Sequence, residues 1–244
     1  MIPKLLEDDA LDNNDDEQKA MALINTVYFD AKWENPYRRS TTTDFTNKDG
    51  VKKEVEGLYA GSNNYYELDN ALAFKKPYAG KYQFVGILPD EGIDIDDYIA
   101  GIDPEKLSKQ LRTPGDMENT IVSTMIPEFE YDYNCTLNDT LKQMGMKSAF
   151  DGELADFSKI NDLSVEGAGP LYISSVIQKT NIKLTKEGTK AAAATAVIMT
   201  MGSAGPGQNP PRYIDIYLER PFVYMIIDEN DVPLFIGAVT DIGK

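Results

Sequence analysis

The chain has 244 residues and no histidine, and its 40 acidic against 24 basic residues give a formal net charge of −16. The missing histidine removes the usual general base of serine and cysteine hydrolases and the commonest zinc ligand. The acidic surplus argues against binding to nucleic-acid phosphates or to an anionic membrane surface. The single cysteine, Cys135, cannot form a disulfide within the chain, and we expect a reduced, packed thiol. We therefore expect no enzyme, metal, cofactor, nucleic-acid partner or membrane insertion.

Strands dominate the predicted elements. The nearly unbroken apolar run at 20–29 predicts a strand covered on both faces at the centre of a sheet, with Asn25 as a buried amide that needs a partner. Further strands are predicted at 53–59, 63–69, 71–78, 82–88, 120–127, 129–133, 171–184, 213–217, 222–227 and 234–239. Helical spacing predicts two short helices within 94–112, separated at Pro104, and a third over 136–146. This is a single α+β domain with antiparallel hairpins toward the C-terminus.

The most unusual composition lies between Lys186 and Pro211. Propensity alone favours a helix through Ala191, Ala192, Ala193 and Ala194. Residues 202–211, however, hold three glycines and three prolines, which predicts an exposed, mobile loop. No acidic residue occurs from Gly188 to Ile214 in a chain that has 40 of them.

Four groups of segments carry a resemblance to one known family. They are Glu187–Ala196; Arg220–Ile227 with Pro233–Gly237; Asn25–Trp33 with Pro36; and Leu141–Met146 with Ala149–Phe150 and Ala155–Ser158. Together these segments, which follow in the family's order along nearly the whole chain, resemble the serpins, a family of serine protease inhibitors. The resemblance implies a multi-sheet fold with a large mixed sheet and a mobile reactive-centre loop at about 188–212. It also implies that 1–244 is one domain that is incomplete at its N-terminus, with the family's N-terminal helices missing.

The resemblance assigns a hinge to the start of the loop. A serpin offers its loop as a substrate, and the cleaved loop then enters the protein's own sheet as an added strand. A strand that slides between two others must carry small side chains at its leading end, and Ala191–Ala194 satisfy that demand. Gly188 permits the backbone turn after Glu187, and Thr189 is small and compatible with a strand. We expect Lys190 to point outward, and 189–201 to insert.

The scissile bond is expected near the far end of the inserting segment. Counting from Gly188 by the family's pattern places it at Gly202–Ser203, with Met201 as the neighbouring residue. Small or unbranched apolar residues before the bond suit elastase-, subtilisin- or chymotrypsin-like pockets. Arg212 would suit a trypsin-like pocket, but it lies too far along the loop.

Three departures from the family's pattern concern the sheet. Members carry a glutamate and a lysine as an ion pair where this chain has Lys186 and Glu128, so both signs are inverted and attraction would be kept. Gln178 replaces the family's histidine and is expected to be the partner of Asn25. The third departure is the late start of the chain. Apart from these departures, Trp33 is expected to anchor the packing at the top of the large sheet.

Two other readings stay open beside the inhibitor of a serine protease. One is a non-inhibitory binding or carrier protein on the same scaffold, and the other is an inactive truncated fragment. A monomer is expected. The first residues lack the layout of a secretory signal, and an extracellular or cell-envelope location is expected from the resemblance alone.

Overall fold

The computed structural model describes residues 21–160, 171–189 and 210–242, and its contacts divide the chain into two compact units. The first unit comprises Met1–Phe29 and Tyr131–Ile182, and the second comprises Asp30–Glu130 and Lys183–Lys244. No helix in the described ranges is long and apolar enough to span a bilayer.

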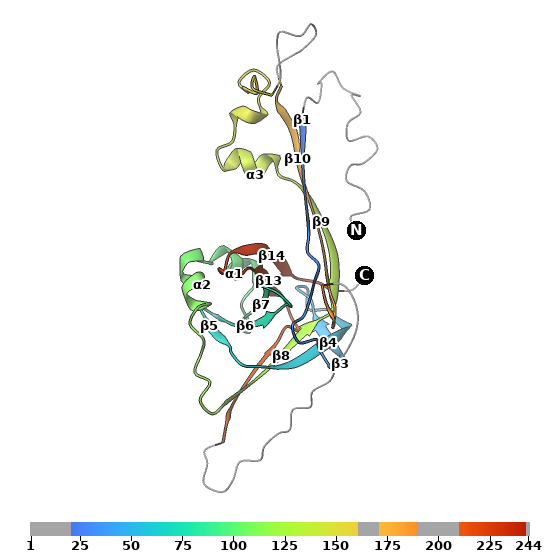
Figure 1. Ribbon diagram of the computed structural model, residues 1–244, viewed down its shortest axis with the longest axis vertical. Helices are drawn as coiled ribbons and strands as arrows, with labels where there is room; N and C mark the ends of the chain where they lie inside the picture. Colours follow the sequence, from blue (N-terminus) through green and yellow to red (C-terminus); the bar gives the residue numbers. More distant parts are fainter. Residues whose placement is uncertain (1–20, 161–170, 190–209, 243–244) are drawn as a thin grey trace. The chain divides into compact units, whose positions relative to one another are not determined.

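The first unit is built on a three-stranded sheet in the order β1–β10–β9. These strands are β1 (Met21–Tyr28), β10 (Ile173–Leu184) and β9 (Phe129–Thr136), and Figure 1 shows them side by side with helix α3 (Asn138–Gln143). β1 and β10 run parallel. The short 3-10 helix η1 (Ser148–Phe150) follows α3, which is shorter than the predicted helix over 136–146.

The prediction of a central, doubly covered strand at 20–29 was wrong. β1 is an edge strand of its sheet, and Asn25 is exposed rather than buried. Leu23 and Ile24 are 42% and 40% exposed. The apolar pattern indicates what a strand can bury, but in the described part of this unit these side chains are covered only in part.

The second unit contains a five-stranded sheet in the order β14–β13–β7–β6–β5. Its strands are β5 (Tyr66–Leu68), β6 (Ala71–Pro77), β7 (Gln83–Pro89), β13 (Phe222–Ile227) and β14 (Pro233–Val239). β13 is buried at every position and β7 at all but its first residue, as their unbroken apolar runs predict for strands with both faces covered.

Two short helices cover one face of this sheet. α1 (Ile95–Ala100) and α2 (Pro104–Gln110) are capped by the side chains of Asp94 and Asp103, which accept hydrogen bonds from main-chain N–H groups of the first turn. Pro104 opens α2, where a missing N–H costs nothing, so the predicted division at this residue is confirmed. Ile95 of α1 and Leu111, which follows α2, join the buried cluster of this face.

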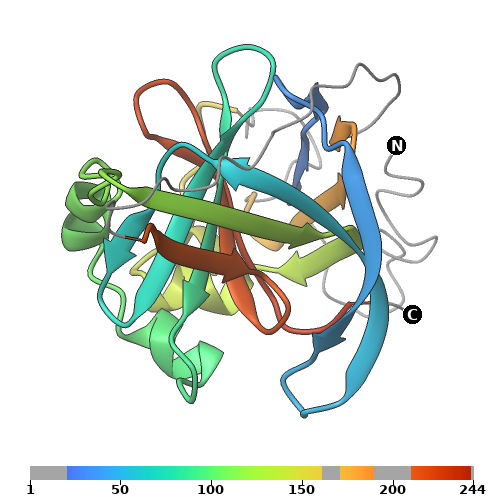
Figure 2. The same ribbon diagram turned by 90° about the horizontal axis from the view of Figure 1, so that it is seen from below.

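The second unit also contains a four-stranded sheet in the order β12–β8–β4–β3. Its strands are β3 (Arg39–Thr46), β4 (Lys52–Ser62), β8 (Thr120–Pro127) and β12 (Arg212–Tyr217). Figure 2 shows green β8 between orange-red β12 and cyan β4. β12 runs parallel to β8, although the two are far apart in the sequence.

The smallest sheet positions the candidate site. It pairs β2 (Ala31–Lys32) with β11 (Gly188–Thr189) in antiparallel register, Gly188 opposite Lys32 and Thr189 opposite Ala31. Neither strand was predicted, because two residues are too few to show a period. β11 is the last described part of the chain before the segment 190–209.

Candidate functional site

A tight turn at the end of β10 precedes Gly188, the predicted hinge glycine. The N–H of Thr185 donates to the carbonyl oxygen of Gly188 at 2.9 Å, and the N–H of Gly188 donates back to that of Thr185 at 3.1 Å. The Thr185 hydroxyl also donates to the Gly188 carbonyl, at 2.9 Å. Lys186 and Glu187 form the tip of this turn. The turn therefore fixes the direction in which the chain leaves β10.

Gly188 lies directly against the backbone of β2. Its φ is +136°, and a Cβ atom built there would stand 2.4 Å from the carbonyl oxygen of Ala31 and 2.5 Å from the Cα of Lys32. Both contacts are with backbone atoms, which cannot rotate away as a side chain would. Position 188 thus requires a glycine, both for its backbone conformation and for its close approach to β2.

Trp33 is a buried aromatic residue that contacts the turn before Gly188. It is 2% exposed, and its ring stacks on Tyr78 with centroids 4.2 Å apart and 8° between planes. Tyr37 and Phe84 meet the same indole edge-on, at 5.8 Å and 6.0 Å. The indole Nε1 donates to the carbonyl oxygen of Thr185 at 2.9 Å. Trp33 thus lies next to the turn that precedes Gly188, and its role as an anchor at the top of the large sheet stays a prediction.

The segment 33–37 binds the three consecutive carbonyl groups of residues 185–187, in the turn before Gly188. Besides the Trp33 side chain on Thr185, the main-chain N–H of Trp33 donates to Glu187 at 3.1 Å. The N–H of Tyr37 donates to the carbonyl oxygen of Lys186 at 3.0 Å. Any movement of the turn must therefore break hydrogen bonds to this segment.

The expected pair of Lys186 and Glu128 meets in a different way. The Glu128 carboxylate accepts a hydrogen bond from the main-chain N–H of Lys186 at 2.8 Å, while the Lys186 side chain is exposed. None of the ion pairs found among the described residues joins these two side chains. The inverted charges are thus brought close together, but the contact belongs to the backbone and does not depend on the sign of residue 186.

Asn25 and Gln178 face one another in register on the parallel strands β1 and β10. Their main chains are adjacent, but Asn25 is exposed and the hydrogen bond expected between the two side chains stays a prediction. Cys135 is half-buried on β9 and is in no disulfide.

The remaining predicted residues lie outside the described part of the chain. These are Ala191, Ala192, Ala193, Ala194, Met201, Gly202 and Ser203. Arg212, the alternative position for the scissile bond, is the first residue of β12 and lies opposite Thr120 of β8. Its guanidinium donates to the Tyr65 hydroxyl at 3.2 Å and approaches Glu67.

Sequence reasoning missed Tyr37, Tyr78 and Lys76, which complete the support of Trp33. The Lys76 ammonium lies 4.1 Å from the ring centroid of Tyr37 and 5.4 Å from that of Trp33. A lysine in a strand is ordinarily read as a solvated position, and only the observation that it interrupts the apolar run of β6 could have drawn attention to it.

The hydroxyl of Tyr37 is buried and has no hydrogen-bond partner among the described residues. Burial, followed by the neighbouring Tyr78, holds the pKa of this phenol well above its usual value. Because a buried hydroxyl without a partner costs free energy, Tyr37→Phe should keep the ring contacts and leave stability unchanged or raise it by about 1 kcal/mol. Thermal unfolding measures this, and a loss of more than about 2 kcal/mol would mean that the hydroxyl has a partner.

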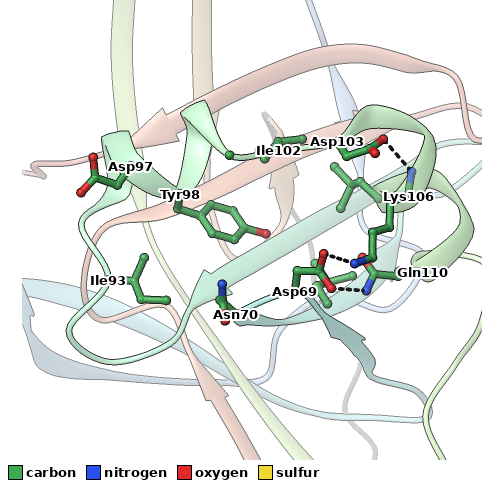
Figure 3. A pocket seen from close by; sticks show the side chains of 12 residues that line it. Asp69, Asn70, Ile93, Asp97, Tyr98, Ile102, Asp103, Lys106 and Gln110 are labelled. Carbon is green, nitrogen blue, oxygen red and sulfur yellow. Dashed lines mark hydrogen bonds and ion pairs between the residues drawn. The ribbon is translucent and has the colours of Figure 1, made fainter.

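A separate pocket of about 260 Å³ lies beside α1, α2 and β5. Asp69 projects into it and is bound by Lys106 and, at 3.2 Å, by Gln110 (Figure 3). The hydrogen bond from Lys106 is the main cause that lowers the pKa of Asp69. Burial, with Asp69 and Asp90 nearby, raises the pKa of Tyr98 to about 12. The Asp69 carboxylate is thus already satisfied within the chain, and the pocket offers no comparable link to the hinge.

The family model described as "Serpin (serine protease inhibitor)" matches residues 1–242. The chain belongs to the serpin family. It is 28% identical to the human leukocyte elastase inhibitor over 100% of this chain and 61% of that relative. It is also 28% identical to human plasminogen activator inhibitor 2, over 97% of this chain and 55% of that protein.

Solved structures agree with this assignment. The crystal structure of tengpin, a thermophilic serpin, in its native state matches with a TM-score of 0.78 and 38% identity, over 91% of this chain and 55% of that one. Human thyroxine-binding globulin, solved with its ligand, has the same fold at a TM-score of 0.73 and 23% identity. The predicted α+β serpin fold is confirmed. The chain spans 50% to 61% of the length of the curated relatives that it matches.

Proposed function

We propose that this chain inhibits a serine protease by suicide-substrate trapping, with a reactive-centre loop at about 188–212. The protease cleaves near Gly202–Ser203, and residues 189–201 then insert into the large sheet. The observation that carries the proposal is the hinge itself. Gly188 is packed on β2, the turn before it is held through three carbonyl groups, and four small residues follow.

The composition of the segment after the hinge supports insertion rather than simple display of a loop. Ala191–Ala194 carry minimal side chains and no charge, so they meet little steric or desolvation cost when they enter a sheet. A carrier protein on the same scaffold would have no need of this restriction. Relatives named as elastase and plasminogen activator inhibitors point the same way.

The residues before the proposed bond define the class of target. Met201 and Gly202 are small or unbranched and apolar, which suits the specificity pockets of elastase-, subtilisin- or chymotrypsin-like enzymes. Arg212 is already engaged in β12, which speaks against cleavage after this residue. We infer a monomeric inhibitor without cofactor that acts outside the cell or in the cell envelope, where such proteases work.

The test is to mix the 244-residue chain, and any longer form of the same protein, with a subtilisin-like protease, an elastase and chymotrypsin. We expect a covalent complex that survives SDS, together with a released peptide that begins at Ser203 or Gly202 by mass spectrometry. Cleavage in the loop without a complex would favour the carrier alternative, or a fragment unable to trap. The absence of both with every protease would contradict the proposal.

A further inference from the structure

Lys76 lies beside segment 33–37, and the proposed function does not explain its position there. It belongs to β6, where it is half-buried, and its Nζ donates to the carbonyl oxygen of Asn35 at 2.9 Å. The same ammonium lies over the rings of Tyr37 and Trp33. It is therefore surrounded by the segment 33–37, which binds the carbonyl groups of the hinge.

The charge of Lys76 is compensated by rings and a carbonyl group rather than by a carboxylate. Its neighbour Lys75 forms an ion pair with Asp231 at 3.0 Å, whereas none of the ion pairs among the described residues includes Lys76. Cation–π contacts and a carbonyl oxygen stabilise an ammonium only in part when it leaves water. Burial accordingly lowers the pKa of Lys76 to about 8. Both the charged and the neutral form are thus populated near neutral pH.

This titration is unusual in a chain without histidine. The ionisable residues nearest to Lys76 in the elements that meet there are Lys75 on β6, which is paired with Asp231, and Glu34, Tyr37, Tyr78, Lys186 and Glu187. Cys135 on β9 and the terminal amine are removed as variables by control variants.

We propose that the buried charge of Lys76 weakens the binding of segment 33–37 to the carbonyl groups of residues 185–187. Loss of the Lys76 proton then strengthens this binding. The sign follows from linkage. If opening the segment returns Lys76 to water, the ammonium is favoured in the open arrangement and the neutral amine in the closed one. Closure should therefore strengthen as the pH rises through about 8 toward 10.5, the range between the two pKa values.

Weakened binding of residues 185–187 suits a loop that must move rapidly after cleavage, and in this respect the inference rests on the proposed function. Hydrogen exchange of the Trp33 and Tyr37 amides reports on the contacts of segment 33–37 and not on protease trapping. A chain that forms no protease complex can still confirm or contradict it, so failure of one proposal can be told from failure of the other.

The experiment follows hydrogen exchange of the Trp33 and Tyr37 amides at pH 7 and pH 9.5, corrected for intrinsic exchange, together with fluorescence of Trp33, the only tryptophan. Lys76→Met removes the charge at similar length, and Lys76→Arg keeps it at both pH values. Cys135→Ser and an acetylated terminus control for the other groups. In the wild type we expect protection to rise roughly tenfold with pH and fluorescence to change with a midpoint near pH 8.

Each variant should reproduce one of the two protonation states of Lys76 at both pH values. Lys76→Met should show the high protection at both pH values, and Lys76→Arg the low one, with neither showing the fluorescence transition. If Lys76→Arg does not fold, the comparison of the wild type with Lys76→Met still decides. Protection that is independent of pH in the wild type, or that rises equally in Lys76→Met, would overturn the proposal.

Discussion

Replacing Gly188 with alanine should destabilise the protein by about 3 kcal/mol, because the new Cβ meets backbone atoms of β2 in a conformation that L-residues rarely adopt. The nearest atom, the Ala31 carbonyl oxygen, would be 2.4 Å away. Relief requires β11 to separate from β2, which also breaks the hydrogen bonds between the turn and segment 33–37. The melting temperature should fall by about 6–12 °C, and the fluorescence of Trp33 should shift toward that of an exposed indole.

Gly50→Ala is the matched control for this variant. Gly50 also has a positive φ, +79°, but a Cβ there would meet no atom within 4 Å. Its substitution therefore reports the backbone strain without the close approach, and we expect a loss of only about 1 kcal/mol. If both variants unfold at the same temperature and Trp33 fluorescence is unchanged in Gly188→Ala, the packing of the hinge against β2 is not what restricts residue 188.

Much of the second unit could be predicted from the sequence because its elements carry strong local signals. The unbroken apolar runs of β7 and β13 indicated central strands, and Pro104 divided α1 from α2. β3 was missed because its sequence, rich in serine and threonine at an edge of the sheet, shows no apolar period. The apolar run of β1 misled for the opposite reason, since periodicity cannot tell which other segments cover a strand.

The candidate site could be predicted only where composition was distinctive. Gly188 and Trp33 were found from a motif and a rare residue, and the closeness of Glu128 to Lys186 was anticipated, though not its main-chain form. Tyr37 and Lys76 could not be found, because their importance arises from strands that meet only in the fold. From the sequence, a lysine such as Lys76 is expected to be solvated, and only the fold shows the two rings and the carbonyl group around it.

Replacing Ala193 with arginine should strongly reduce trapping while leaving cleavage of the loop intact. In an inserted strand the side chains alternate, so if Lys190 points outward, Ala191 and Ala193 point inward. An unpaired guanidinium on the inner face opposes insertion by several kcal/mol, and the yield of SDS-stable complex should fall roughly a hundredfold. Released peptide should still appear, because the protease reads the loop before insertion begins.

Ala192→Arg places the same side chain one residue earlier, on the outward face of the inserted strand. We expect this variant to keep most of the trapping activity, since its guanidinium stays in water and only the register distinguishes it from Ala193→Arg. The two are compared by the ratio of complex to cleaved chain on a denaturing gel, at equal extents of protease consumption. Equal loss in both would mean that charge or bulk anywhere in the loop impairs protease binding, and the alternation expected of strand insertion would be wrong.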